Sequence, residues 1–454
     1  MTMPLIAVPE GLETGAFLLG HGALRSVPEL LKTYFPGKVP WIIADGNTWK
    51  AAGEAVYGYL KDAGMEPADP YMFPADPRPH PDYAVSLKLA KIMADNVVPV
   101  AVGSGVINDL VKCASGIRNV RYCCVATACS VDGYTSKGGA MTVEGTKKTV
   151  PCPPPYAICA DVDVLEKAPP EMFASGYADL AAKIIGGADW IIADTLGFEP
   201  IRQDIWQLIQ VPLRDQLADP SKMGPVFNGL ASAGYGMQMY HDSRPASGSE
   251  HMYSHIWEME GLTCNGVDVS HGFKVAIGTL TSTLLHEYVI RNDFAALEPK
   301  MAKPLSQAER QQEIDALLVK NCYGPGPAET ALKKYLTPEQ TLERRKLIGS
   351  KWPELQRRLK ERIIPFDELR AMLKNADCPV TPAQIGLSRE QYLHAVPTAQ
   401  FIRTRYTVLD LLYECGLLAD AIKSLEKIFG PLLPAVRTLH RLTVWRRPHR
   451  DGSR

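Results

Sequence analysis

The first 165 residues alternate short apolar runs with segments of helical periodicity. Four apolar runs end in a polar residue or a glycine, which is typical of strands that are buried on both faces of a parallel sheet. These runs are WIIAD (41–45), PVAVGSG (99–105), CCVAT (123–127) and AICAD (157–161). Helical patterns lie between them in WKAAGEAVYGYLKDAG and DYAVSLKLAKIMADN. The pattern predicts a parallel α/β sheet, in which ligands bind beyond the carboxyl ends of the strands.

After residue 166 the pattern changes, because strand-like runs nearly vanish and helical periodicity replaces them. Long helical patterns with capping residues occupy 170–197, 343–363, 366–376 and 404–430. A chain of 454 residues is also too long for one ordinary core. We therefore expect an α/β nucleotide-binding domain over residues 1–166. A mostly α-helical domain with a C-terminal extension is expected over residues 167–454.

Composition and charge narrow the class of protein. The chain has 49 basic and 50 acidic residues, so nothing indicates a nucleic-acid partner. We interpret the one basic run, RTLHRLTVWRRPHRDGSR (437–454), as a solvated or disordered end rather than a nucleic-acid contact. No apolar run approaches the roughly 18 residues of a membrane span, and the N-terminus lacks the pattern of a signal peptide. The ten cysteines form no CxxC pair and are interpreted as reduced, mostly buried thiols in a cytoplasmic protein.

The segment AVGSGVINDLVKCAS places the sequence GSG (103–105) between a predicted strand and a predicted helix. Backbone N–H groups at such a helix N-terminus suit a pyrophosphate. The segment departs from the dinucleotide-binding pattern, since Asn108 occupies the third glycine position and Asp45 precedes the glycines. On spacing alone, nucleotide binding and an ordinary tight turn remain equally open.

A long polar loop follows the third predicted strand. It begins TACSVDGYTSKGGAMTVEGTKK and carries Asp132, Ser136 and Lys137 among small residues. Loops at the carboxyl edge of a sheet usually contact ligands. The alternative is a solvated hairpin with lysines on its edge.

Three further segments supply donors for a divalent metal. Asp179 lies in SGYADLAAK, His251 and His255 lie in GSEHMYSH, and His271 lies in VSHGFKVAIG. The two histidines of the second segment are four residues apart, so in a helix both rings leave the same face. Carboxylate and imidazole donors suit a borderline cation, and three ligands leave a position open for substrate. The alternative is that none of these residues binds a metal. Asp179 would then only interact with the helix dipole near a helix start, and the histidines would only pack in the core.

Five motifs in this order resemble the sn-glycerol-1-phosphate dehydrogenases, most closely their longer bacterial form. They are GSGVIND, CSVDGYTSKGG, SGYADLAAK, RPASGSEHMYSH and SHGFKVAIGTL. The resemblance covers roughly residues 15–290. The segment IRTRYTVLDLLYECGLL is also similar to the bacterial C-terminal region. The family belongs to the iron-containing alcohol dehydrogenase and dehydroquinate synthase-like superfamily. The resemblance therefore implies a dehydroquinate synthase-like fold and an NAD(P)-dependent oxidoreductase.

The resemblance also implies roles for individual residues. Asp179, His251 and His271 would hold one divalent metal, zinc or nickel. His255, Asp132 and Asp179 would act in catalysis and contact the substrate. The residues matched to the cofactor loop and its continuation are Gly103, Ser104, Gly105, Val106, Ile107, Asn108, Asp109, Thr127, Ser130 and Ser136. Asp45 ends a predicted strand. A carboxylate at this place accepts hydrogen bonds from the adenosine ribose hydroxyls and repels a 2′-phosphate, so we expect NAD(H) to be preferred over NADP(H).

The implied reaction is the reversible reduction of dihydroxyacetone phosphate to sn-glycerol 1-phosphate. A divalent metal would offset the charge that develops on the ketone oxygen, and His255, or groups that it orients, would supply the proton. The candidates for binding the phosphate are Lys137, Lys148, Arg244 and Lys274. Two alternatives are a polyol or alcohol dehydrogenase and a sugar-phosphate cyclising synthase on the same scaffold. A third is a silent nucleotide-binding assembly protein. The resemblance also implies a homodimer or a larger homo-oligomer.

Overall fold

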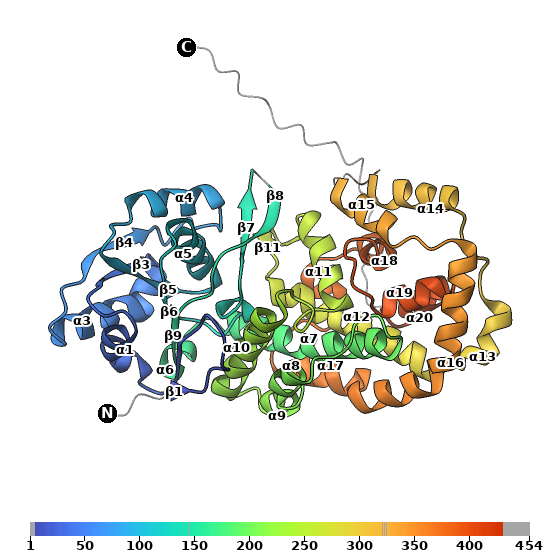
Figure 1. Cartoon of the computed structure of the whole chain (residues 1–454), viewed down its shortest axis with the longest axis horizontal. Helices are drawn as coiled ribbons and strands as arrows, with labels where there is room; N and C mark the ends of the chain where they lie inside the picture. The colour runs from blue at the N-terminus through green and yellow to red at the C-terminus, as the bar shows by residue number, and fades with distance from the viewer. Residues whose placement is uncertain (1–4, 145, 320, 322, 324, 430–454) are drawn as a thin grey trace, which may run out of the picture.

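The computed structural model describes residues 5–144, 146–319, 321, 323 and 325–429. The N-terminal part is an α/β sheet and the C-terminal part is an assembly of helices (Figure 1). The basic run 437–454 lies outside the described residues. Among the described helices, none is long and apolar enough to cross a membrane. The nine described cysteines are free thiols and most of them are buried, as the sequence predicted.

Seven strands form the N-terminal sheet, in the order β1-β2-β9-β6-β5-β3-β4. Only the pair β1–β2 is antiparallel among these described strands, and the other neighbours are parallel. The strands are β1 (Leu5–Ile6), β2 (Ala16–Gly20), β3 (Val39–Asp45), β4 (Ala68–Phe73), β5 (Val97–Gly103), β6 (Cys123–Ala126) and β9 (Ala157–Asp161). The four predicted strands correspond to β3, β5, β6 and β9. The predicted parallel sheet is therefore confirmed.

Helices cover both faces of this sheet. Ile42 and Ala44 of β3 pack in one core with α1 and α3, whereas Ile43 packs in another core with α4 and α5. Alternate residues of a strand point to opposite faces, so a strand covered on both sides has to be apolar throughout. The helices of this part are α1 (Val27–Tyr34), α2 (Gly46–Thr48), α3 (Glu54–Asp62), α4 (Tyr83–Ile92), α5 (Gly105–Arg118) and α6 (Val162–Leu165).

The strand order reverses between β3 and β5. Strand β3 pairs with β4 on one side and with β5 on the other. Asp45 and Gly103, the last residues of β3 and β5, therefore lie at the point where the connections diverge. In open α/β sheets, ligands bind in the crevice at this switch point.

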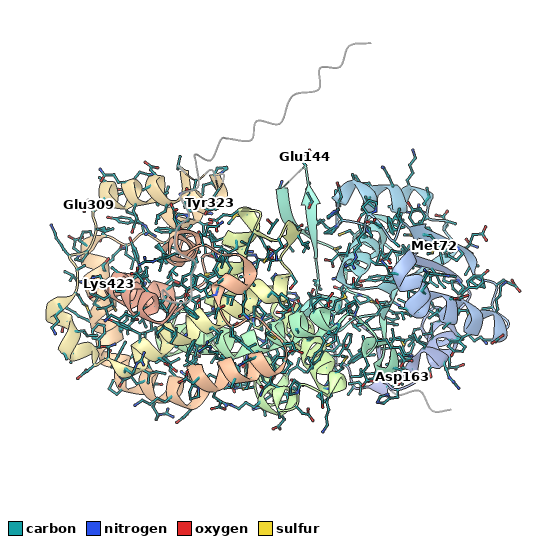
Figure 2. All side chains as sticks on the ribbon, turned by 180° about the vertical axis from the view of Figure 1, so that it is seen from behind. Met72, Glu144, Asp163, Glu309, Tyr323 and Lys423 are labelled. Carbon is teal, nitrogen blue, oxygen red and sulfur yellow. The ribbon has the colours of Figure 1, made fainter. Side chains whose placement is uncertain are left out.

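A hairpin rises between the two parts of the molecule (Figure 1). Its strands are β7 (Gly139–Val143) and β8 (Thr146–Val150). Glu144 lies at its tip with a left-handed φ of 52°, and Figure 2 shows this residue at the upper edge of the molecule. This segment of the polar loop is thus a hairpin, and Lys148 is one of its lysines. Contact between the polar loop and a ligand stays a prediction.

The rest of the described chain is mostly helical, as predicted. The elements nearest the candidate site are α7 (Pro170–Thr195), α10 (Met223–Tyr240), α11 (Ser249–Met259), β10 (Thr263–Cys264), β11 (Val267–Asp268) and α12 (His271–Arg291). The others are α8 (Gln203–Ile209), α9 (Leu213–Leu217), α13 (Phe294–Leu297), α14 (Gln307–Ile314), α15 (Pro325–Lys333), α16 (Pro338–Arg362), α17 (Phe366–Asn375), α18 (Arg389–Ala399), α19 (Val408–Glu414) and α20 (Leu418–Phe429). The helical pattern at 404–430 is broken at Gly416, whose φ of 69° ends α19. The domain boundary at residue 167 stays a prediction.

Helix α7 runs almost entirely buried through the helical part and contacts the sheet part at its first turns. A Cβ on Gly176 would lie 2.2 Å from the carbonyl oxygen of Cys129, so only glycine lets the loop after β6 approach so closely. Asp179 follows one turn later on the same helix. Asp179 therefore lies inside α7 and not at a helix start, which removes the interpretation of this carboxylate as a first-turn dipole partner.

Candidate active site

Asp179, His251 and His271 lie together although they come from three different helices. Each offers one ligand atom, and the three atoms lie within 4.8 Å of one another. Asp179 is on α7, His251 is on α11 and His271 is the first residue of α12. The structure thus brings together the three residues that the sequence singled out for a metal.

Each of the two imidazoles has a carboxylate at its Nδ1 atom. His251 Nδ1 lies 2.8 Å from Glu250 Oε1, and His271 Nδ1 lies 3.0 Å from Glu258 Oε1. A ring whose Nδ1–H donates to a carboxylate keeps the lone pair of Nε2 for a metal. Nε2 of His251 lies 3.4 Å from Asp179 Oδ1. One carboxylate and two imidazoles oriented in this way fit a borderline divalent cation.

A buried lysine joins this cluster. Lys183 lies one turn after Asp179, and its Nζ is 2.8 Å from Asp179 Oδ1 and 2.7 Å from Asp132 Oδ2. Burial acts to raise the pKa of Asp179, but the charges of Lys183 and the two imidazoles outweigh burial and hold this pKa well below its usual range. The Asp179 carboxylate is therefore ionised, as a metal ligand has to be.

His255 lies one turn after His251 and outside the triad of ligand atoms. The ring centroids of His251 and His255 are 6.5 Å apart, compared with 5.3 Å for His251 and His271. Burial lowers the pKa of His255 to about 4, although Glu258 acts to raise it, and the positive charge of Arg403 lowers it further. His255 is thus neutral at neutral pH and is able to accept a proton.

His251 has the opposite protonation behaviour. Burial acts to lower its pKa, but Asp179 and Glu250 raise the pKa to about 9. At neutral pH the imidazole carries a proton when no metal is bound. Metal binding at this nitrogen therefore releases a proton and becomes weaker at low pH.

The predicted cofactor residues lie at the carboxyl ends of the strands. A Cβ on Gly103 would lie 2.5 Å from Ile107 Cβ, so the tight turn into α5 requires glycine. Asp45 Oδ1 accepts hydrogen bonds from the backbone N–H groups of Asn47 and Thr48, at 2.7 and 2.9 Å, and so caps α2. Both bonds use the same oxygen, so this capping is compatible with a second contact to a ribose.

The residues of the glycine loop have different environments. Ser104, Gly105 and Val106 are partly exposed, whereas Ile107 and Asn108 are buried. Asn108 Oδ1 accepts from the Tyr122 hydroxyl at 2.9 Å. Asp109 Oδ2 accepts from the backbone N–H of Ala140 at 3.2 Å, and its other oxygen lies 3.4 Å from Lys112. Their roles in cofactor binding stay predictions.

The loop after β6 connects the cofactor end to the metal ligands. The backbone N–H of Thr127 donates to the carbonyl of Gly103 at 3.1 Å, and the backbone N–H of Asp132 donates to Asp179 Oδ2 at 2.9 Å. Ser130 and Ser136, which lie along the same loop, are each 7% exposed. A ligand that extends from the start of α5 to the metal ligands would lie along this loop.

The start of α11 is held by a buried carboxylate of α7. Asp189 Oδ2 accepts from the backbone N–H of Ser249 at 2.6 Å, and Oδ1 accepts from that of Val408 at 2.8 Å. His286 Nε2 lies 3.2 Å from Oδ1. The first turns of α11 and α19 are therefore fixed by one side chain.

The four candidates for binding phosphate differ in their partners. Lys137 pairs with Glu13 at 2.7 Å, and the buried Arg244 pairs with Glu199 at 3.0 Å. Lys274 Nζ lies 3.4 Å from Glu258 Oε1, the oxygen that also contacts His271. Lys137, Arg244 and Lys274 thus all have acidic partners, and Lys274, which also donates to the carbonyl of Val269 at 3.0 Å, is the one whose acidic partner contacts a proposed metal ligand.

Several charged residues of the site were missed in the sequence. Lys183 follows Asp179 by four residues and Glu258 follows His255 by three, which are spacings that place side chains on one helical face. These local signals were available. Asp189 and Arg403 give no such signal, because their partners lie far along the chain.

Residues 18–169 match the model of a family described as iron-containing alcohol dehydrogenase. The chain is 29% identical to glycerol-1-phosphate dehydrogenase (NAD(P)+) of Geobacillus thermodenitrificans, over 88% of this chain and 93% of that protein. It is 30% identical to the protein of the same name from Bacillus velezensis, over 59% of this chain and 71% of that protein. The crystal structure of glycerol dehydrogenase from Schizosaccharomyces pombe has the same fold, with a TM-score of 0.56, 14% identity, and coverage of 94% of this chain and 95% of that chain.

Proposed function

The chain belongs to the glycerol-1-phosphate dehydrogenase family, and we propose that it catalyses the reversible, NAD(P)H-dependent reduction of dihydroxyacetone phosphate to sn-glycerol 1-phosphate. The observation that carries this proposal is the contact between the two halves of the site. The backbone N–H of Asp132, on the loop that starts at the cofactor end, donates to Asp179 among the metal ligands. Hydride transfer requires a cofactor and a polarised carbonyl side by side, and this contact supports such an arrangement.

Asp179, His251 and His271 would hold zinc or nickel, since one carboxylate and two imidazoles are borderline donors. A divalent metal there supplies a positive charge that offsets the charge developing on the carbonyl oxygen during hydride transfer. Lys183 keeps Asp179 ionised and ties it to Asp132.

His255 moves the proton in this proposal. Its imidazole is neutral at neutral pH, so it accepts the hydroxyl proton of the alcohol in the oxidation direction. In the reduction direction, the ring takes a proton from solvent water, and the same nitrogen passes this proton to the product oxygen. Glu258, 3.3 Å from His255 Nδ1, orients the ring and partly offsets the charge that forms on it.

In this proposal, separate sets of residues bind the cofactor and the phosphate of the substrate. The partly exposed first turn of α5 receives the pyrophosphate at its backbone N–H groups, and Asp45 accepts from the adenosine ribose. Lys274 is placed first among the phosphate ligands because it lies beside the residues that surround His271. Arg403 is added to the candidates, since its charge acts on His255. The homo-oligomer and the cytoplasmic location stay predictions.

The test is an absorbance assay of NADH oxidation with zinc, with nickel or with a chelator. Dihydroxyacetone phosphate should be reduced with a kcat/KM roughly a thousandfold or more above that of dihydroxyacetone, because a neutral analogue leaves the phosphate donors unpaired. Lys274→Met should reduce this ratio, whereas Lys222→Met, which replaces an exposed lysine that pairs with Asp219, serves as the control. Comparable rates for both substrates would instead indicate a polyol dehydrogenase, and the absence of turnover under all conditions would indicate a silent nucleotide-binding protein.

A further inference from the structure

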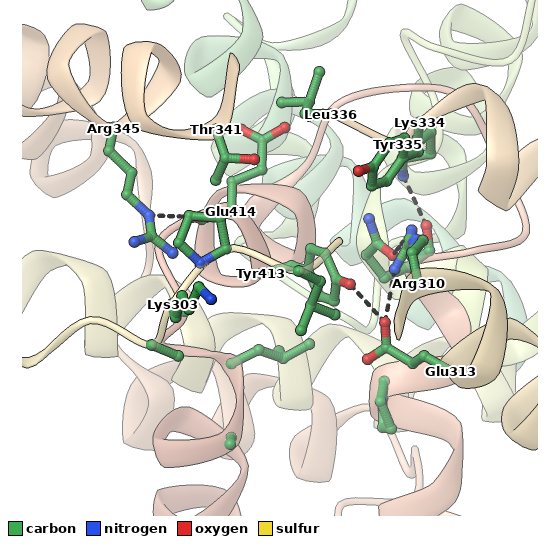
Figure 3. A pocket seen from close by; sticks show the side chains of 18 of the residues that line it. Lys303, Arg310, Glu313, Lys334, Tyr335, Leu336, Thr341, Arg345, Tyr413 and Glu414 are labelled. Carbon is green, nitrogen blue, oxygen red and sulfur yellow. Dashed lines mark hydrogen bonds and ion pairs between the residues drawn. The ribbon is translucent and has the colours of Figure 1, made fainter. Parts of the chain in front are cut away.

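A cavity of about 290 Å³ lies among the C-terminal helices (Figure 3). Its walls come from α14, α16, α18, α19, α20 and the segments before α14 and α16. Of the described residues that line it, none belongs to the candidate active site. Its apolar walls include Pro304, Leu305, Leu336, Leu418 and Ile422.

Most charged groups on the wall already have partners. Arg310 Nη1 donates to Glu313 Oε2 at 3.0 Å, and Lys334 donates to the carbonyl of Gln400 at 2.7 Å. The carboxylate of Glu414 accepts from Arg344, at 3.2 Å, and from the hydroxyl of Tyr406. These groups complete the helix packing and leave little demand for a ligand.

Arg345 is different, because it is buried with most of its donors unused. Its residue exposure is 7%, and its Nε donates to the carbonyl of Glu414 at 2.7 Å. The two terminal nitrogens have no hydrogen-bond acceptor among the described residues. A guanidinium has five N–H donors, so the four donors on the terminal nitrogens are open to solvent and to a ligand in the cavity. Burial lowers the pKa of Arg345, and Glu414 offsets this only in part.

A second cation also lines the cavity. It is Lys303, which is labelled with Arg345 in Figure 3. Lys303 is exposed and makes no ion pair with a described residue. The lining of the cavity therefore combines these two cationic groups with aliphatic side chains, and an anion beside Arg345 would meet its unused donors.

We propose that this cavity is a binding site for a small amphipathic carboxylate. The planar guanidinium of Arg345 matches a carboxylate with two parallel hydrogen bonds, and Lys303 adds a second charge. The leucine and isoleucine side chains take the aliphatic body away from water. One water molecule occupies roughly 30 Å³, and the cavity has about ten times this volume. A body of about ten non-hydrogen atoms, as in octanoate, fits this volume. The site is separate from the proposed reaction, so either proposal can fail without the other.

The experiment is isothermal titration of the full chain with octanoate, beside octan-1-ol as a neutral probe of the same length. Octanoate should bind about ten- to a hundredfold more tightly than octan-1-ol, because only the carboxylate satisfies the donors of Arg345. Arg345→Met should remove this difference. Arg357→Met, an exposed arginine on the same helix that pairs with Glu361, is the matched control and should bind octanoate as the parent chain does.

A second variant tests the apolar part without removing a charge. Ile422→Trp keeps both cations and fills the aliphatic wall, so it should weaken octanoate binding by about tenfold or more. Circular dichroism of each variant establishes that it is folded. No binding of octanoate to the parent chain, equal binding of octan-1-ol, or unchanged binding in folded Arg345→Met or Ile422→Trp protein would overturn the proposal.

Discussion

Replacing Lys183 by methionine removes a buried positive charge from between Asp132 and Asp179. The side chain of Lys183 is completely buried, and its ammonium lies 2.7 and 2.8 Å from the two carboxylates. Methionine keeps a flexible chain of similar length without the charge. Breaking a buried ion pair in this way costs about 3–5 kcal/mol in the free energy of unfolding. In a chain of 454 residues, each kcal/mol shifts the melting temperature by about 1 °C, so this temperature should fall by roughly 3–5 °C in the presence of a chelator.

A metal at Asp179 should reverse much of this loss. A divalent cation bound to the Asp179 carboxylate again gives this buried charge a partner, and ligands that bind only the folded state add stability. We expect the loss of unfolding free energy in Lys183→Met to fall by about half or more when zinc is present. Urea unfolding of the parent and variant chains, with zinc and with a chelator, measures the four values that are needed.

Lys112 provides the matched control. It is also completely buried, and its Nζ donates to the carbonyls of Gly133 and Gly138 at 2.8 and 3.1 Å. Because it contacts none of the three proposed ligands, Lys112→Met should lose the same stability with and without zinc. If Lys183→Met lost the same stability under both conditions, or lost less than about 1 kcal/mol, the reasoning about a metal held by Asp179 would be refuted.

Three further predictions concern single residues. His251→Ala should lose both metal and activity, because two ligands hold a divalent ion poorly. His255→Ala should keep near one ion per chain in elemental analysis while turnover falls by about 10²–10⁴-fold. Equal retention of the metal in both variants would remove α11 from the metal site. Asp45→Ser should shift the ratio of kcat/KM for NADH and NADPH toward NADPH, and an unchanged ratio would contradict the proposed contact between Asp45 and the adenosine ribose. Burial raises the pKa of Glu414 from 4.5 to about 7, although the charge of Arg344 acts to lower it. The protonated carboxyl therefore adds to the free energy of unfolding below pH 4.5, and this contribution is lost as the pH rises to about 7. Glu414→Gln should remove this part of the pH dependence of urea unfolding, whereas parallel profiles for parent and variant would show that Glu414 does not cause it.

The fold was predictable where burial leaves a local trace in the sequence. Strand β3 is covered on both faces, so its residues form an apolar run that any window detects. Strand β4 was missed because it lies at the edge of the sheet, is half-exposed and contains Pro70, which is tolerated at an edge but weakens the strand signal. The hairpin β7–β8 was only an alternative, since its polar, lysine-bearing strands resemble a loop.

The candidate site was predictable only in part, for a related reason. The spacing of His251 and His255 indicates a shared helical face, and family motifs supplied the assignment of metal and substrate roles. Contacts between distant segments leave no such pattern. The Asp189 carboxylate joins residues that are 60 and 219 positions away in the sequence. Likewise, nothing near Arg345 in the sequence indicates that its guanidinium lines a cavity with donors unused.

The carboxylate of Asp189 links the end of the chain that carries α19 to the helix that carries His251 and His255. A fragment that ends before Val408 would leave one oxygen of this buried group without its amide donor, while the other oxygen still holds the first turn of α11. Losing a hydrogen bond to a buried charged group costs about 1.5–3 kcal/mol. Trimming or proteolysis near residue 400 would therefore loosen the helix that carries His251 and His255, far from the cut. The start of α19 is in this sense part of the scaffold that holds the candidate active site.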